Sequence, residues 1–289
     1  MDINKMPKTY AERTIVHAKA NEDYYRHPAK YYLKPFKLAG NLYYIGDKMV
    51  CSHLIDTGDG LIVFDSGFPH ATHLLVQAIW ELGFNPAAIK YLIHSHGHFD
   101  HIGGANAFKE LYGCQLCLSA ADAAMFRTRP DLALLKDGPS PFAELFVPDI
   151  ELEDGAVLTL GNTSIRCVLT PGHTPGVMSF FFTIQEQDKT YNVGYFGGAG
   201  FNTLYKTFFD QYHLSYALRD AFLASLAKVR NYKVDIVMGN HPNMNHTLEK
   251  REQQLANPQG PNPFIDATEW QRMCDNLQHD FKAFLASGR

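Results

Sequence analysis

The chain alternates short apolar runs, rich in β-branched and aromatic residues, with longer segments whose apolar residues recur at helical spacing. The apolar runs predict strands near 42–46, 49–56, 61–65, 90–94, 114–118, 157–160, 163–170, 177–184, 190–197 and 234–238. The helical patterns predict helices at 70–83, 104–112, 119–127, 211–230 and 268–286. Strand-rich stretches followed by helices occur once in each half. This order is the one expected if two similar halves pack with their sheets face to face and helices outside, and it supports an α/β fold of four layers, an αββα sandwich.

Residues 94–101 carry the densest chemistry and read His-Ser-His-Gly-His-Phe-Asp-His. Imidazole is the commonest side-chain ligand for zinc-like metals, and few structural roles require so many histidines. The segment follows a predicted strand and precedes a predicted helix, a position where open α/β sheets place their chemistry. His96 and His98 can converge on one ion, while Asp100 and His101 can face a second. An open two-metal centre is therefore the natural hypothesis.

Two further turns place a histidine directly after a predicted strand. His173 lies in a Pro/Gly-bracketed turn after the apolar run 165–169, and His241 precedes a proline after the run 235–238. A closed structural zinc site normally uses cysteine and needs only four ligands. The three histidine-bearing turns together favour a catalytic metal centre.

With these motifs the sequence resembles the metallo-β-lactamase fold hydrolases. Residues 96–101 match the family motif HxHxDH, and Val63–Gly67 match its strand-terminal Asp-x-Gly motif. The resemblance implies that two zinc ions are bound, one by three histidines and the other by an aspartate and two histidines: His96, His98 and His173, then Asp100, His101 and His241. It also implies that the carboxylate of Asp65 orients a ligand. The extra histidine, His94, is interpreted as a supporting or structural residue, with a variant first ligand as the alternative.

A missing aspartate narrows the resemblance to one subclass of the family. Most hydrolases of this fold carry a bridging aspartate between the last two histidine motifs, but residues 195–202 read Tyr-Phe-Gly-Gly-Ala-Gly-Phe-Asn, without Asp, Cys or His. This pattern is most similar to the third subclass of class B (zinc) β-lactamases, as are the stretches 36–46 and 262–270. The serine that many members place near the second metal is replaced by Gly198 or Ala199. We expect these two residues and Asn202 to border the substrate groove.

The resemblance favours a di-zinc hydrolase that opens a cyclic amide, as β-lactamases do. Zinc lowers the pKa of bound water to about 7, so the ions would supply a hydroxide that Asp100, as catalytic residue, would orient. Two alternatives remain open. The same machinery could act on another ester, lactone or thioester in the cytoplasm, or the fold could hold a single iron and act as an oxygenase.

Composition sets the frame for these motifs. The 289 residues are 46% hydrophobic and 19% charged, which predicts one large core: an N-terminal extension at 1–35 and a single catalytic domain at 36–289. A net charge of −4 and a pI near 6.4 do not indicate the basic surface that binds nucleic acid, so a small-molecule substrate is expected.

No apolar run is long enough for a membrane span. No secretory leader is recognisable either, which predicts a cytoplasmic protein if Met1 is the native start and a periplasmic or secreted one if a leader was removed. The oligomeric state stays open.

Three segments outside the metal motifs are expected to shape the substrate groove: the proline-rich loop 127–148, residues 201–212 and the tyrosine-rich stretch 24–32. The remaining histidines are interpreted as surface or packing residues, with a rim position left open for His246. They are His17, His27, His53, His70, His73, His213, His246 and His279.

Overall fold

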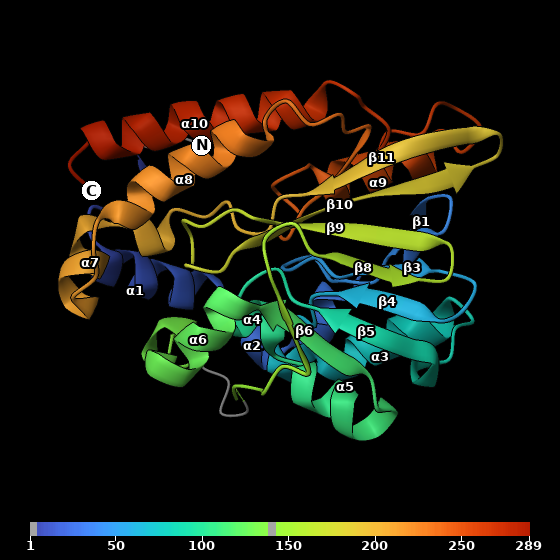
Figure 1. The fold of residues 1–289 in the computed structure, drawn as a ribbon, viewed down its shortest axis with the longest axis horizontal. Helices are drawn as coiled ribbons and strands as arrows, with labels where there is room; N and C mark the ends of the chain where they lie inside the picture. Colours follow the sequence, from blue (N-terminus) through green and yellow to red (C-terminus); the bar gives the residue numbers. More distant parts are fainter. Residues whose placement is uncertain (1–4, 138–142) are drawn as a thin grey trace.

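The computed structural model describes residues 5–137 and 143–289, and two β-sheets lie face to face at its centre (Figure 1). The first sheet has seven strands in chain order: β1 (Phe36–Ala39), β2 (Leu42–Tyr44), β3 (His53–Asp56), β4 (Leu61–Phe64), β5 (Ile89–Ile93), β6 (Gln115–Ser119) and β7 (Ile150–Leu152). The second has five, in the order β12 (Ile236–Met238), β11 (Lys189–Tyr195), β10 (Met178–Glu186), β9 (Thr163–Leu169) and β8 (Val157–Leu160).

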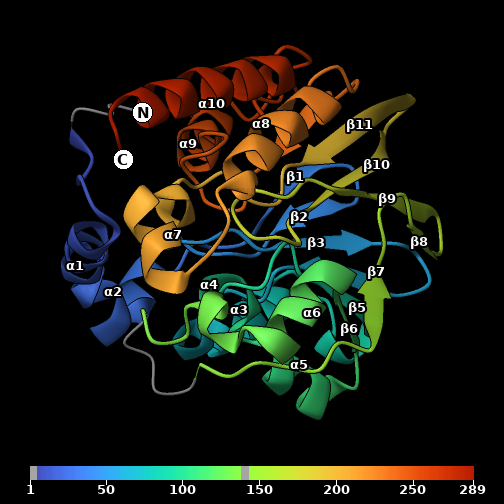
Figure 2. The same cartoon turned by 60° about the vertical axis from the view of Figure 1, so that its left-hand side comes forward.

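Helices cover the outer face of each sheet, as Figures 1 and 2 show. Beside the first sheet lie α3 (Thr72–Glu81), α4 (Phe99–Ile102), α5 (Ala105–Tyr112) and α6 (Ala120–Thr128). Over the second lie α8 (Ala217–Val229) and α10 (Glu269–Ala286). The remaining α-helices are α1 (Tyr10–Ala20), α2 (Glu22–Arg26), α7 (Lys206–Tyr212) and α9 (Thr247–Ala256). The four layers confirm the predicted αββα sandwich.

The interior between the sheets is apolar and aromatic. Phe64 of the first sheet contacts Phe180 and Tyr195 of the second, with ring centroids 5.2 and 5.8 Å apart, and all three side chains are buried. Burial of this kind drives the two sheets together, since each apolar face must leave water. It also fixes how the strand ends of the two sheets meet at one edge.

The parallel parts of both sheets point their carboxyl ends to that edge. Strands β4, β5 and β6 run parallel in the first sheet, and β11 runs parallel to β12 in the second. β9 and β11 both pair antiparallel with β10, so they share one direction. The turns after β5, β9 and β12 carry the histidine motifs.

Two predicted elements differ in extent. The strand expected at 49–56 begins only at His53, because the Asp47 side chain accepts hydrogen bonds from the backbone N–H groups of Met49 and Val50 and holds a turn there. The helix expected at 211–230 is two helices, α7 and α8. They are separated at His213, whose φ of 52° is left-handed and ends the first helix.

Several elements escape the sequence patterns. The strands β1 and β7 are only four and three residues long and are not among the predicted strands; β7 follows the loop expected at 127–148. The helices α1, α2 and α9 were also not predicted; α1 has a capping box at Thr9 and Glu12 but only one buried side chain. In the loop expected at 127–148, two of the prolines, Pro139 and Pro141, lie outside the described residues.

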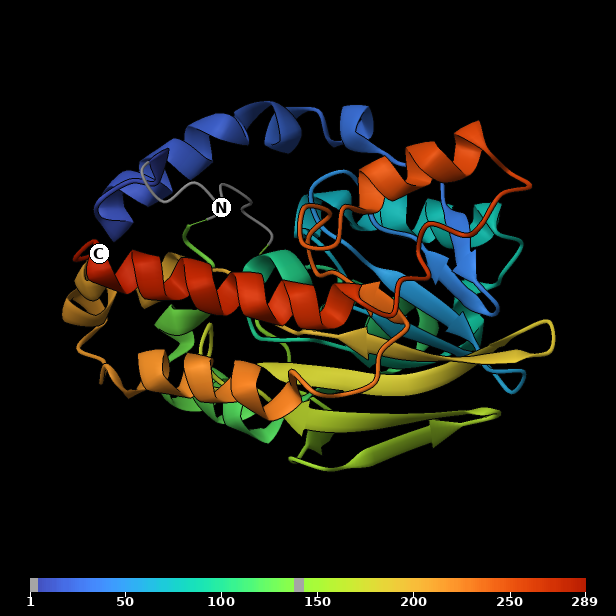
Figure 3. The same cartoon turned by 90° about the horizontal axis from the view of Figure 1, so that it is seen from above.

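The N-terminal helices pack against the sandwich (Figure 3). The backbone N–H of Tyr10 donates to Thr207 Oγ1 at 2.9 Å, and the fully buried Tyr24 donates from its hydroxyl to Asp47 at 2.6 Å. The domain boundary at residue 35 stays a prediction. Within the described ranges, every helix is too short or too polar to cross a membrane.

Candidate metal centre

The histidine segment is fixed to the loop that follows β4. Ser66 donates its backbone N–H to the carbonyl of His101 at 2.8 Å, and Gly103 donates to the carbonyl of Gly67 at 2.8 Å. The chain approaches so closely here that a Cβ on Gly103 would lie 2.2 Å from the nitrogen of Pro69. A glycine is therefore required at 103, and it sets the turn that carries the preceding side chains.

Three histidines converge at the end of β5 and β9. His96, His98 and His173 each offer a ring nitrogen, and these nitrogens all lie within 4.8 Å of one another. His96 and His173 face carbonyl oxygens with Nδ1, at 2.8 Å to Gly197 and 2.9 Å to Gly200, so each can donate from Nδ1 and leave Nε2 with a lone pair. His98 Nδ1 lies 2.9 Å from His173 Nε2. Ring nitrogens of three histidines thus gather at one place.

One atom of this group has no polar partner. His96 Nε2 is buried without a hydrogen bond among the described residues, and leaving such a nitrogen unpaired costs free energy. Burial lowers the pKa of His96 and His98 well below the usual value, and it lowers the pKa of His173 to about 3. The rings are therefore neutral at pH 7, the form that binds a metal.

A second group surrounds the carboxylate of Asp100. Its Oδ2 lies 3.5 Å from Nε2 of His101 and 3.5 Å from Nε2 of His241. Ligand atoms about 2.0–2.1 Å from a tetrahedral zinc ion are separated by about 3.3 Å, so this spacing suits ligands of one ion. Burial opposes the carboxylate charge of Asp100, but the two neighbouring histidines outweigh it and hold its pKa below the usual range.

Each histidine of the second group is oriented through its other ring nitrogen. His101 Nδ1 lies 2.9 Å from Asp65 Oδ2, and His241 Nδ1 lies 2.9 Å from the carbonyl of Met49. Burial disfavours the charged ring of His101, yet the carboxylates of Asp100 and Asp65 raise its pKa. A carboxylate behind a histidine is a common means of fixing the ring and raising its basicity as a ligand.

Asp65 is buried at the centre of this support, in the position expected from the sequence. It also accepts hydrogen bonds from Ser95, at 2.7 Å from the backbone N–H and 2.8 Å from the hydroxyl, and from the Tyr195 hydroxyl. His94 lies further back, 3.2 Å from the Ser66 hydroxyl and 3.2 Å from the Cys117 carbonyl. That hydroxyl hydrogen-bonds the carbonyl of His101, which links His94 to the segment without placing it among the clustered nitrogens.

Asp122 was not singled out in the sequence, although it joins two of the histidine-bearing turns. Its buried carboxylate accepts hydrogen bonds from Gly97 N–H at 2.7 Å, Thr174 Oγ1 at 2.8 Å and Gly176 N–H at 2.8 Å. Burial raises its pKa to about 6, against the three donors. The motif Ser119-x-x-Asp122 reads as an ordinary helix start, and the side chain of Ser119 does cap α6.

A cavity of about 770 Å³ opens over the two groups. Its floor includes His98, Asp100, His173 and His241. Of the three residues expected to border the groove, Ala199 and Asn202 line the cavity and Gly198 does not. A Cβ on Gly198 would lie 2.9 Å from Cγ2 of Val177 and 3.1 Å from Cβ of His173, so a side chain has no room there.

The walls differ in part from expectation. Leu134 and Asp137, from the long loop before β7, line the cavity, as does His246. The stretch 24–32 contributes no lining residue; instead α1 supplies Arg13 and His17. His17, interpreted from the sequence as a surface or packing residue, is partly buried and lines this cavity.

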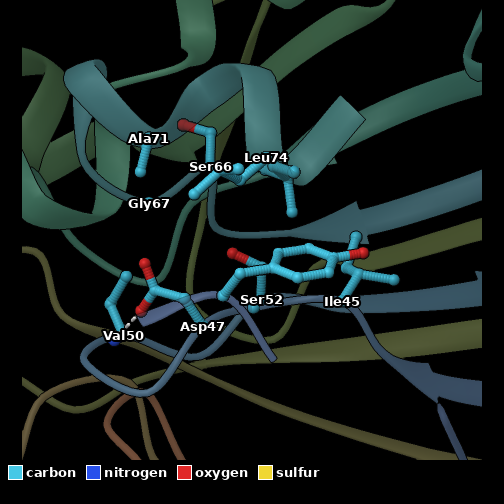
Figure 4. A pocket seen from close by; sticks show the side chains of 11 residues that line it. Ile45, Asp47, Val50, Ser52, Ser66, Gly67, Ala71 and Leu74 are labelled. Atoms are coloured by element: carbon cyan, nitrogen blue, oxygen red, sulfur yellow. Dashed lines mark hydrogen bonds between the residues drawn. The ribbon is translucent and has the colours of Figure 1, made fainter. Parts of the chain in front are cut away.

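A second cavity is much smaller and lies apart from the clustered histidines. It measures about 20 Å³, and Figure 4 shows Asp47, Ser52 and Ser66 among the residues around it. This volume suffices for about one water molecule. The large cavity is therefore the candidate substrate site.

Comparison with known proteins gives a consistent family. The model of the metallo-beta-lactamase superfamily matches residues 45–186. Among curated proteins, hydroxyacylglutathione hydrolase GloC of Haemophilus influenzae is 30% identical over 152 residues, which cover 52% of this chain and 68% of that protein. A hydroxyacylglutathione hydrolase of Anaeromyxobacter dehalogenans is 30% identical over 125 residues, covering 43% of this chain and 39% of that protein.

Solved structures match over a longer span. BJP-1, a subclass B3 metallo-beta-lactamase of Bradyrhizobium japonicum, superposes with a TM-score of 0.77 at 28% identity, covering 89% of this chain and 95% of that one. The metallo-beta-lactamase FEZ-1 of Legionella gormanii gives a TM-score of 0.77 at 26% identity, covering 89% and 97%. The predicted resemblance to the third subclass of class B enzymes is confirmed at the level of structure.

Proposed function

The chain belongs to the metallo-β-lactamase superfamily and is a metal-dependent hydrolase, and on that premise we propose that it uses two zinc ions to open a cyclic amide of the β-lactam type. The observation that carries this proposal is the paired ligand geometry: three histidines converge on one point, and Asp100 with two histidines surrounds another. The likeness to subclass B3 enzymes over 89% of the chain supports the substrate class.

The donor set suits zinc. Five imidazoles and one carboxylate are ligands of the kind that zinc prefers. The buried, unpartnered His96 Nε2 gains a partner when an ion is bound. We assign the first ion to His96, His98 and His173. We assign the second to Asp100, His101 and His241.

The chain's own residues would bind and orient the reactants. Zinc, when bound, supplies a nucleophile near neutral pH and polarises the carbonyl of the substrate. Asp100, with an ionised carboxylate at the cavity floor, is the residue placed to hold the nucleophile in line with that carbonyl. Asp65 and the Met49 carbonyl keep His101 and His241 in fixed orientations, which lowers the cost of assembling the site.

Thioester hydrolysis is a second candidate, because the curated relatives named above are hydroxyacylglutathione hydrolases. The segment after β11 favours the first candidate. It has no carboxylate between residues 195 and 202, and the space beside Gly198 is filled by Val177 and His173. A metal-bridging aspartate of the kind expected in such hydrolases has no counterpart there.

A turnover screen distinguishes the two candidates. The zinc-loaded protein is incubated with a chromogenic cephalosporin, a carbapenem, a lactone and a glutathione thioester, and a chelator-treated sample serves as the blank. We expect the β-lactams to be hydrolysed with a kcat/KM at least tenfold above that for the thioester. A thioester preference, or lactam turnover that persists after metal removal, would contradict the proposal.

A further inference from the structure

Helix α1 presents a polar stripe to the metal cavity. Arg13, His17 and Asn21 follow one another at intervals of four residues, so they lie on one side of the helix. All three line the same cavity as Asp100 and His241. The helix is held there by the hydrogen bond from Tyr10 N–H to Thr207 and by its contacts with α7.

Arg13 is a cation that has no counter-ion among the described residues. Its guanidinium makes no ion pair or side-chain hydrogen bond with any residue in 5–137 or 143–289, whereas Arg129 and Arg230 are both paired with carboxylates. A guanidinium group carries five N–H donors in a rigid plane. It can therefore bind a carboxylate through two parallel hydrogen bonds.

The other charged residues around the cavity leave this role to Arg13. The second lining cation, Lys48, directs its ammonium to the carbonyl of Lys30 at 3.5 Å. The lining carboxylates other than Asp100 are Asp137, Glu249 and Asp280, and Asp137 accepts a hydrogen bond from the Tyr10 hydroxyl.

The part of the cavity wall that follows β11 carries no alternative cation. The cavity residues that follow β11 are Ala199, Gly200 and Asn202, none of which is charged. A substrate carboxylate would therefore find its cationic partner on α1 rather than on this loop.

We propose that Arg13 is the anion-recognition residue of the substrate site and pairs with a carboxylate of the substrate, so that the enzyme selects anionic substrates. This inference rests on the proposed function for the identity of the reaction. It adds the chemical class of the substrate and assigns its recognition to a helix that lies outside the metal-binding turns.

Matched substrates and variants test this assignment. KM and kcat are measured for a β-lactam as the free acid and as its methyl ester, with the zinc-loaded wild type, Arg13→Ala and Arg13→Lys. Lys19→Ala, which removes an exposed cation from the same helix, is the control. We expect Arg13→Ala to raise KM for the acid about tenfold to a hundredfold, with kcat within about threefold and the ester unaffected. Arg13→Lys should recover part of the loss, and Lys19→Ala should change nothing.

Equal effects on acid and ester would show that Arg13 acts through structure and would overturn the inference. Absence of any turnover by the wild type would instead overturn the proposed function. In that case the same acid and ester are titrated calorimetrically into the wild-type and Arg13→Ala proteins. Acid-selective binding that Arg13→Ala abolishes would support the inference, and equal binding by both proteins would overturn it.

Discussion

The carboxylate of Asp122 accepts a hydrogen bond from the backbone N–H of Gly97, 2.7 Å away, in the middle of the histidine segment. The same carboxylate binds the turn that carries His173, through Thr174 and Gly176. One buried side chain thus fixes the relative position of turns that are far apart in the sequence. The spacing of the three clustered histidines depends on it.

Replacing this carboxylate should loosen the first metal group. Asp122→Ala leaves the N–H groups of Gly97 and Gly176 buried without acceptors, so we expect the free energy of unfolding to fall by at least about 2 kcal/mol. Zinc affinity should fall with it. Denaturant unfolding and competition with a chelator measure the two effects. Asp188→Ala, at an exposed turn, is the control, and an Asp122→Ala protein as stable as that control would contradict the role.

Asp65 should tune metal affinity through His101. Asp65→Asn keeps the shape of the side chain but removes the charge that faces His101 Nδ1 at 2.9 Å. Loss of such a partner typically weakens metal binding about 10–100-fold, and we expect a loss in this range for the second ion. Chelator competition on Asp65→Asn and on the exposed control Asp59→Asn measures it. Identical zinc affinities in the two variants would refute the orienting role of Asp65.

Gly198 should resist any side chain. A Cβ there would lie 2.9 Å from Val177 Cγ2 and 3.1 Å from His173 Cβ, so Gly198→Ser must push one of them aside. Crowding of this kind costs about 1–3 kcal/mol, and we expect weaker zinc binding because His173 moves. Adding Val177→Ala should restore part of the stability. A Gly198→Ser protein that melts and binds zinc like the wild type would show that space is available at this position.

His53 should make the fold sensitive to acid. It is fully buried between the sheets, neither ring nitrogen has a polar partner among the described residues, and burial lowers its pKa from 6.5 to about 3. Below pH 6.5 the ring of His53 is therefore protonated in the unfolded chain but stays neutral in the folded protein. Stability from this residue is present above pH 6.5 and is lost as the pH falls toward 3, at up to about 1.4 kcal/mol per pH unit.

The variant His53→Leu isolates this effect. It removes the titrating group while keeping a similar volume, so its unfolding free energy should fall less steeply with acid than that of the wild type. Unfolding is measured between pH 5 and 8 with a chelator in all samples, so that metal release does not contribute. His279→Leu, at an exposed position, should follow the wild type. Parallel curves for wild type and His53→Leu would exclude His53 as the source.

The sandwich and the six clustered side chains could be predicted because short, continuous stretches of sequence indicate them. Each of three apolar runs of strand length is followed by a turn that contains glycine or proline together with a histidine. This local pattern predicts that His96, His173 and His241 lie at strand ends. Parallel strands then bring those ends to one edge of the fold. The Asp-Ser-Gly turn after β4 likewise places Asp65 behind the centre.

The remaining features depend on contacts that the sequence does not record. Arg13 and His17 lie on a helix with a weak apolar face, and only tertiary packing against α7 brings them over the metal groups. Asp122 reads as the first turn of a helix, and its partners are 25 and 54 residues away in the chain. The break between α7 and α8 falls at a non-glycine residue, His213, whose left-handed backbone no residue pattern signals.

The metal content of protein purified without added metal tests the two-zinc centre most directly. We expect close to two zinc ions per chain in the wild type. In His241→Ala we expect about one, because that variant removes a ligand of the second ion and leaves His96, His98 and His173 intact. A wild-type protein with a single iron per chain, or a His241→Ala protein that keeps both zinc ions, would contradict the account.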